Sequence, residues 1–213
     1  MNITMLHRFL KDIKYNFILP PRGIDFGNMN KKETAETFMW FMDHLPEKMD
    51  YLRFRCSSDL HISIKKLDYS DKSLVLIWRW FLKVARLEDT PREILDTMIE
   101  GSKIFGDSYI SRKVLSVTTH MIVIDIALYT GECYIRNYPH LCWTYRTAPR
   151  DSITINQPVI SGMISTYKGK NRPIDFAPIH MVGVQASRIL DHSANEEDLI
   201  NMYQCWEKYA VKS

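Results

Sequence analysis

The sequence lacks the short motifs that mark common catalytic and nucleotide-binding sites. It contains no Gly-x-Gly-x-x-Gly segment, no Walker-type phosphate loop, no Gly-x-Ser-x-Gly elbow and no His-Glu-x-x-His pair. Dinucleotide binding, phosphate-loop chemistry, serine hydrolysis and a helix-borne zinc site are therefore not indicated. The four cysteines, Cys56, Cys133, Cys142 and Cys205, form no Cys-x-x-Cys pair. This spacing favours reduced, mostly buried thiols over a disulfide framework, and we expect no cofactor and no metal.

Long hydrophobic runs are missing as well. Residues 1–8 lack the basic start and the apolar core of a secretory signal. The longest strongly apolar run, residues 121–129, is interrupted by Asp125 and is far shorter than the roughly 20 residues that span a bilayer. We therefore expect a cytoplasmic protein without membrane contact. The net charge of +3 is too small to indicate nucleic-acid binding by itself.

What the chain does contain is bulky apolar material. Hydrophobic residues make up 46% of its 213 residues, which is enough to bury one sizeable core. No internal repeat and no Gly/Ser/Pro-rich linker divides the sequence. We predict a single domain over residues 1–213, of the α+β class and mostly helical. A small antiparallel sheet in the C-terminal half is expected to pack on a long central helix.

Apolar spacing and capping residues predict where these elements lie. Helices are predicted over residues 2–19, after Asn30, after Ser70, from Thr90-Pro91 to about Phe105 with Gly106 closing it, and after Asn195. Pro46 is expected to kink or interrupt the helix that Asn30 begins. The central helix is predicted to run from Ser111 to the Asn137-Tyr138-Pro139 stop. Strands are predicted over residues 61–64, 141–147 and 152–162, with a strand-to-helix segment over residues 176–190.

Three polar residues of the central helix are spaced so that they share one face. Asp125, Glu132 and Arg136 are seven and four residues apart. The apolar sequence around Asp125 implies burial, and a buried carboxylate must be hydrogen-bonded, paired or protonated. One interpretation makes Asp125 or Glu132 a general acid or base with a raised pKa. The other is structural, with Glu132 binding the indole N–H of Trp143 or backbone N–H groups. We favour the structural role, since no nucleophile or metal-ligand spacing accompanies the carboxylates.

Charge is distributed unevenly along the chain. Residues 146–172 carry five basic side chains and one acid, whereas residues 191–213 carry five acids and two lysines. The candidate binding residues are the five cations and two nearby tyrosines: Arg146, Arg150, Lys168, Lys170, Arg172, Tyr145 and Tyr167. They predict a positive patch for an acidic protein surface or a phosphate-bearing ligand. The alternative is a set of solvated loops without a partner, which is the commoner use of such charges.

Several segments together resemble a known group of proteins. They are Trp40-Phe41 with Pro46, the helix from Leu67-Asp68-Tyr69-Ser70 to Trp80-Phe81, Tyr129-Thr130-Gly131-Glu132, Asn137-Tyr138-Pro139-His140-Leu141-Cys142-Trp143 and Asn156-Gln157-Pro158-Val159. The combination resembles a family of short, uncharacterised cytosolic proteins from Gram-positive bacteria. It is also similar to several immunity-protein families found near polymorphic toxins. The resemblance spans about residues 30–165. It implies an α+β protein without enzymatic activity, and it carries over no catalytic residues.

These observations lead to one main expectation for function and two alternatives. The main one is a non-enzymatic protein-binding module, namely a bacterial immunity protein that binds and blocks a toxin. The first alternative is a small-molecule enzyme with a pocket between the central helix and the sheet. There Glu132 and His140 would act on an anionic substrate oriented by Arg136. The second alternative is a nucleic-acid-binding or defence accessory protein, for which the weak charge gives less support.

Overall fold

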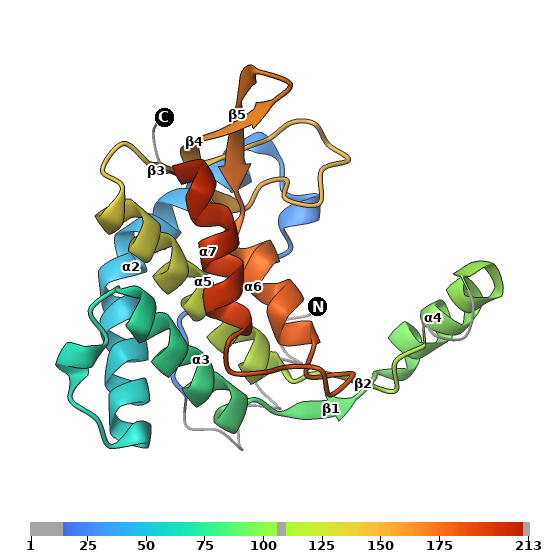
Figure 1. Cartoon of the computed structure of the whole chain (residues 1–213). Coiled ribbons are helices and arrows are strands. Elements are labelled where there is room, and N and C mark those ends of the chain that lie inside the picture. Colours follow the sequence, from blue (N-terminus) through green and yellow to red (C-terminus); the bar gives the residue numbers. More distant parts are fainter. Residues whose placement is uncertain (1–14, 106–109, 211–213) are drawn as a thin grey trace.

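The computed structural model describes residues 15–105 and 110–210, and it confirms the α+β class (Figure 1). Within these residues there are six α-helices and two small antiparallel sheets. The helices are α2 (Lys31–Leu60), α3 (Asp71–Val84), α4 (Arg92–Phe105), α5 (Val117–Asn137), α6 (Pro178–Ser187) and α7 (Asp198–Ala210), with 3-10 turns η1 (Phe26–Asn28) and η2 (Ile64–Lys66). The strands are β1 (Leu87–Asp89) and β2 (Lys113–Leu115) in one sheet, and β3 (Cys142–Tyr145), β4 (Pro158–Tyr167) and β5 (Lys170–Phe176) in the other.

Helix α2 begins where the capping residues predict. The Asn30 side chain accepts the N–H groups of Lys32 and Glu33, and the Glu33 carboxylate accepts the Asn30 N–H. A kink or an interruption is predicted at Pro46, and the interruption is wrong, because α2 is a single helix of 30 residues that contains Pro46. Proline removes one backbone bond, but apolar residues on both sides of Pro46 are buried in the core and hold the helix together. The predicted helices after Ser70, Thr90-Pro91 and Asn195 are also present.

Helix α5 lies at the centre of the molecule, and every residue from Met121 to Gly131 is buried. It packs against α2, α3, α6 and α7. The prediction that it begins at Ser111 is wrong, since residues 113–115 form strand β2 and Ser116 is the N-cap, accepting the Thr119 N–H. Three residues are too few for the alternation that would have indicated a strand.

The three-stranded sheet has the order β3-β4-β5, with Trp143 opposite Ile160 and Met163 opposite Ile174. It reaches the central helix through aromatic side chains. Trp143 lies on Gly131, and the rings of Phe176 and Tyr134 are 5.0 Å apart. The predicted packing of a small C-terminal sheet on the long helix is thus confirmed.

Several predicted boundaries are shifted. Residues 152–157 form turns instead of the predicted strand, because Asn156 adopts a left-handed backbone with φ 61° and its buried amide donates to the carbonyls of Phe26 and Met29. The predicted strand over residues 61–64 is wrong, since His61 is the left-handed C-cap of α2. Residues 15–19 are not helical. Residues 2–14 of that predicted helix and the predicted Gly106 stop lie outside the described residues.

Helix α4 stands apart from the other helices at the end of the β1–β2 ribbon (Figure 1). Its Ile94 and Ile99 side chains are exposed. The base of the ribbon is closed by backbone and side-chain bonds: the Ser116 N–H donates to the Arg86 carbonyl, and the Arg86 N–H donates to the Thr119 hydroxyl. None of the helices in the described part of the chain combines the length and the apolar character needed to cross a lipid bilayer.

Candidate functional site

Asp125 forms a closed polar cluster inside the core. Its carboxylate accepts a hydrogen bond from Lys48 Nζ at 2.8 Å and another from the Tyr15 hydroxyl at 2.9 Å. Lys48 is 5% exposed and Asp125 is 1% exposed. Burial raises the pKa of Asp125, while the ammonium of Lys48 and the hydroxyl of Tyr15 oppose that shift. Burial and the neighbouring carboxylate also raise the pKa of Tyr15. The Asp125 carboxylate therefore has its hydrogen-bond partners within the protein.

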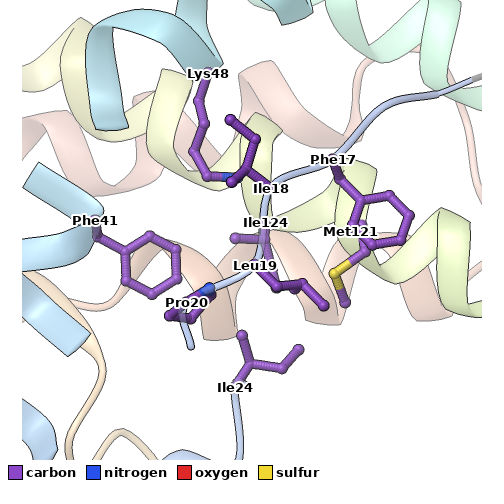
Figure 2. A pocket seen from close by; sticks show the side chains of 9 residues that line it. All are labelled: Phe17, Ile18, Leu19, Pro20, Ile24, Phe41, Lys48, Met121 and Ile124. Carbon is purple, nitrogen blue, oxygen red and sulfur yellow. The ribbon is translucent and has the colours of Figure 1, made fainter. Parts of the chain in front are cut away.

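An extended N-terminal segment seals this cluster from solvent. Figure 2 shows residues 17–20 crossing between side chains of α2 and side chains of α5. The residues around this point are Phe17, Ile18, Leu19, Pro20, Ile24, Phe41, Lys48, Met121 and Ile124, and they leave essentially no room for a water molecule. A substrate therefore has no access to Asp125 in this arrangement.

The sequence interpretation missed Lys48 and Tyr15, which lie 77 and 110 residues from Asp125. A signal for Lys48 was present: it lies seven residues after Phe41 and four before Leu52, on the apolar stripe of α2. A lysine on such a stripe is buried only when it is paired, so it predicts a carboxylate in the core. Tyr15 gave no comparable signal, because it lies within the helix predicted over residues 2–19, whereas residues 15–19 are not helical.

Glu132 lies two turns further along α5 and makes the predicted bonds. The Trp143 indole N–H donates to its carboxylate at 3.0 Å, and Arg136 Nε donates to it at 3.3 Å. The side chain of Glu132 is 13% exposed. A Cβ atom at residue 131 would overlap the Trp143 ring, so Gly131 allows the indole to lie directly on the helix. Glu132 thereby links β3 to α5.

A small hollow borders Glu132 on the side that faces α2. It has a volume of about 190 Å³, and α2, α5 and Tyr69, just before α3, contribute its walls. Tyr69 has a left-handed backbone with φ 66°, its N–H donates to the Tyr129 hydroxyl, and its ring stacks on Tyr129 at 4.5 Å. The guanidinium carbons of Arg136 and Arg53 lie 3.8 Å and 5.4 Å from the centre of the Tyr69 ring. Sequence reasoning found Arg136 and missed Arg53 and Tyr69.

His140, which the enzyme hypothesis pairs with Glu132, lies elsewhere. It belongs to the turn before β3, with its ring 6.4 Å from that of Tyr138, and it is not among the residues that line the hollow. The hollow lies between α2 and α5, not between the central helix and the sheet. In the part of the chain that the structure describes, no three His, Cys, Asp or Glu side chains are grouped so that they could hold a metal ion.

The cysteines divide into two buried and two exposed residues. Cys56 and Cys133 are buried, whereas Cys142 and Cys205 are exposed, and all four are free thiols. Burial raises the pKa of Cys56 to about 12 and that of Cys133 well above its ordinary value. A protonated thiol is a poor nucleophile, so the buried pair does not provide a reactive group.

Two of the seven predicted binding residues, Arg146 and Tyr145, contact other side chains of the protein. Arg146 forms a two-pronged ion pair with Asp175 of β5, with N–O distances of 2.7 Å and 3.1 Å. Tyr145 packs against Phe38 of α2, with ring centres 5.0 Å apart. Both residues therefore brace the sheet.

The other five predicted binding residues are exposed. Arg150 lies in the loop before β4, and Tyr167, Lys168, Lys170 and Arg172 lie on the β4–β5 hairpin, which projects beyond the helices (Figure 1). Tyr167 is 60% exposed, and among the described residues none of the four cations forms an ion pair. We call Arg150, Tyr167, Lys168, Lys170 and Arg172 the basic end.

A comparison of the chain with protein-family models, with curated proteins and with solved structures finds no match. The resemblance to immunity-protein families therefore remains a prediction.

Proposed function

We propose that this protein is a non-enzymatic, cytoplasmic protein-binding module, and that it acts as an immunity protein by occluding the active surface of a toxin. The observation that carries the proposal is the basic end: four exposed cations that form no ion pair within the described chain, three of them on the hairpin that also carries the exposed Tyr167. Exposed aromatic and arginine side chains are common anchors of protein interfaces.

The cations of the basic end favour an acidic partner. Complementary charge mainly increases the association rate and the choice of partner, and its effect extends about 8 Å at physiological salt. Arg146 differs from these four cations, because Asp175 already neutralises its charge. We infer that the partner presents carboxylates opposite Lys168, Lys170 and Arg172, with Tyr167 packed at the centre of the contact.

The contacts of Asp125, Glu132 and His140 support a binding role over a catalytic one. Asp125 is paired and sealed, and the Glu132 carboxylate already accepts bonds from Trp143 and Arg136. His140 and Glu132 do not meet at one hollow. The first alternative, a small-molecule enzyme, therefore loses the constellation on which it depended.

The proposal is tested with the products of the genes that flank this one. Each product is co-expressed with the wild-type chain and with the double variant Lys168→Glu/Lys170→Glu. The matched control is Lys65→Glu/Lys66→Glu, which reverses the same number of exposed charges in η2, away from the hairpin. We expect one flanking product to inhibit growth, the wild type and the control to restore growth, and the hairpin variant to bind that product at least tenfold more weakly.

Two outcomes count against the proposal. If no flanking product binds the wild type, the immunity role is rejected. If the hairpin variant and the control bind equally well, the basic end is not the contact surface. Retention of the wild type on DNA or heparin at physiological salt, lost in the hairpin variant, would instead favour the nucleic-acid alternative.

A further inference from the structure

We propose that the hollow between α2 and α5 is a binding site for a small zwitterion of the α-amino-acid class. This proposal is independent of the basic end, because none of the five residues of the basic end lines this hollow. The volume of about 190 Å³ is large enough for several water molecules or one small solute.

Two guanidinium groups face the same aromatic ring at this hollow. Arg136 stacks on Tyr69, and Arg53 lies nearby on α2. Each arginine is oriented through its Nε: that of Arg53 donates to the Leu67 carbonyl at 2.8 Å, and that of Arg136 donates to Glu132. A guanidinium fixed in this way can present its terminal N–H groups as a fork, which matches the two oxygens of a carboxylate.

Two carboxylates border the same hollow and set the net charge of a suitable ligand. Glu132 lies beside Arg136, and Asp50 lies beside Arg53 with an N–O distance of 3.4 Å. The formal charges of the lining therefore cancel. A phosphate or a dicarboxylate would meet two acids as well as two cations, whereas a zwitterion can place its carboxylate toward the arginines and its ammonium toward the acids.

The remaining walls provide an apolar surface and a rigid frame. Leu45, Pro46 and Met49 of α2 line the hollow, which suits an aliphatic side chain. Tyr69 is held by its bond to Tyr129 and by ring stacking, and its left-handed backbone is uncommon for a bulky residue. Backbone strain of this kind persists only where the surroundings fix it, and it is concentrated at ligand sites.

The Trp143 indole gives a direct readout, because its N–H donates to Glu132 at the edge of the hollow. L-leucine is titrated into ¹⁵N-labelled protein, and the indole signals are followed by NMR, with Trp143→Phe used to assign the reporter. We expect a saturable shift of the Trp143 signal with L-leucine. Binding of 4-methylpentanoate, which lacks the ammonium, and of 3-methylbutylamine, which lacks the carboxylate, should be at least tenfold weaker.

Arg136→Gln and Arg53→Gln should each weaken L-leucine binding at least tenfold. Arg79→Gln is the matched control, because Arg79 is a partly exposed arginine of α3 that pairs with Glu196 away from the hollow. Two variants on different helices keep the test decisive if one of them folds poorly. Lys168→Glu/Lys170→Glu should bind L-leucine as the wild type does, which separates this site from the basic end.

The inference is overturned by any of three results. The first is that L-leucine gives no saturable shift at millimolar concentrations. The second is that 4-methylpentanoate binds as tightly as L-leucine. The third is that both arginine variants keep wild-type affinity while remaining folded.

Discussion

Asp125 and Glu132 lie on the same helix, two turns apart, and each accepts hydrogen bonds from one cation and one aromatic side chain, but they differ in burial and in where the cation comes from. Asp125 is paired with a lysine from α2 and covered by residues 17–20, so its charge is neutralised without solvent. Glu132 is paired with an arginine four residues away and borders an open hollow. Asp125, whose cationic partner comes from another helix, is closed to ligands. Glu132, whose cationic partner is exposed and lies on the same helix, can still be reached by a ligand from the hollow.

The largest effect is expected for the closed cluster. Lys48→Met should lower the free energy of unfolding by about 3–5 kcal/mol, because it leaves the buried Asp125 carboxylate without its charged partner and with only the Tyr15 hydroxyl as a donor. Urea denaturation followed by tryptophan fluorescence measures this loss. Lys72→Met, at an exposed lysine of α3, is the matched control and should stay within about 0.5 kcal/mol of the wild type.

A double variant sharpens the result for Lys48. Lys48→Met/Asp125→Leu should be more stable than Lys48→Met alone, since apolar replacement of a whole buried pair is often neutral. A Lys48→Met protein as stable as the wild type would show that the cluster is open to solvent, and the contrast with Glu132 would disappear.

The next largest effect is expected at the edge of the hollow. Glu132→Ala should lower the free energy of unfolding by about 1–3 kcal/mol, because it removes the acceptor of the part-buried Trp143 indole N–H. Glu132→Gln keeps an acceptor oxygen and should lose less. Thermal melting of the two variants checks the order, and equal melting curves for Glu132→Ala and the wild type would contradict it.

Tyr15→Phe should cost about 1–2 kcal/mol at neutral pH, because one of the two donors to Asp125 is lost. It should also change the pH dependence of stability. Burial raises the pKa of Tyr15 above its ordinary value of 10.0, so the folded protein keeps a proton that the unfolded chain releases. The protonated Tyr15 hydroxyl therefore makes its full contribution to the free energy of unfolding below about pH 10, and that contribution is lost as the pH rises further.

The variant should therefore lose less stability than the wild type as the pH rises above about 10. Some alkaline sensitivity should remain, because burial also raises the pKa of Tyr129, Tyr134 and Tyr203. Parallel alkaline curves for Tyr15→Phe and the wild type would show that Tyr15 does not hold its proton against solvent.

The smallest effect is expected for the exposed partner of Glu132. Arg136→Met should cost less than about 1 kcal/mol, since its i,i+4 ion pair and its stacking on Tyr69 are both partly exposed to solvent. Comparing this loss with that of Lys48→Met shows how much more stability the buried Asp125 draws from its cationic partner than Glu132 does. A loss as large as that of Lys48→Met would show that Arg136 is a structural cation.

Sequence patterns predicted the local features of the molecule and missed the distant pairings. The capping residue Asn30, the Glu132–Arg136 pair and the Glu132–Trp143 bond follow from short spacings, and all three are present. The Lys48–Asp125 pair and the approach of Arg53 to Tyr69 depend on how α2 lies against the rest of the chain, which no local pattern specifies. Strands β1 and β2 are stabilised by each other, and three residues of either one carry too little information alone.

The closed base of the β1–β2 ribbon has a practical consequence for engineering. The backbone leaves the body at Arg86 and returns at Ser116, where the Ser116 N–H donates to the Arg86 carbonyl at 2.9 Å. Joining nearby ends with a different length of polypeptide costs little loop-closure entropy. We therefore expect that the segment over residues 90–112 can be replaced. A tight turn, or a fluorescent or affinity module, should take its place without changing how α3 and α5 pack.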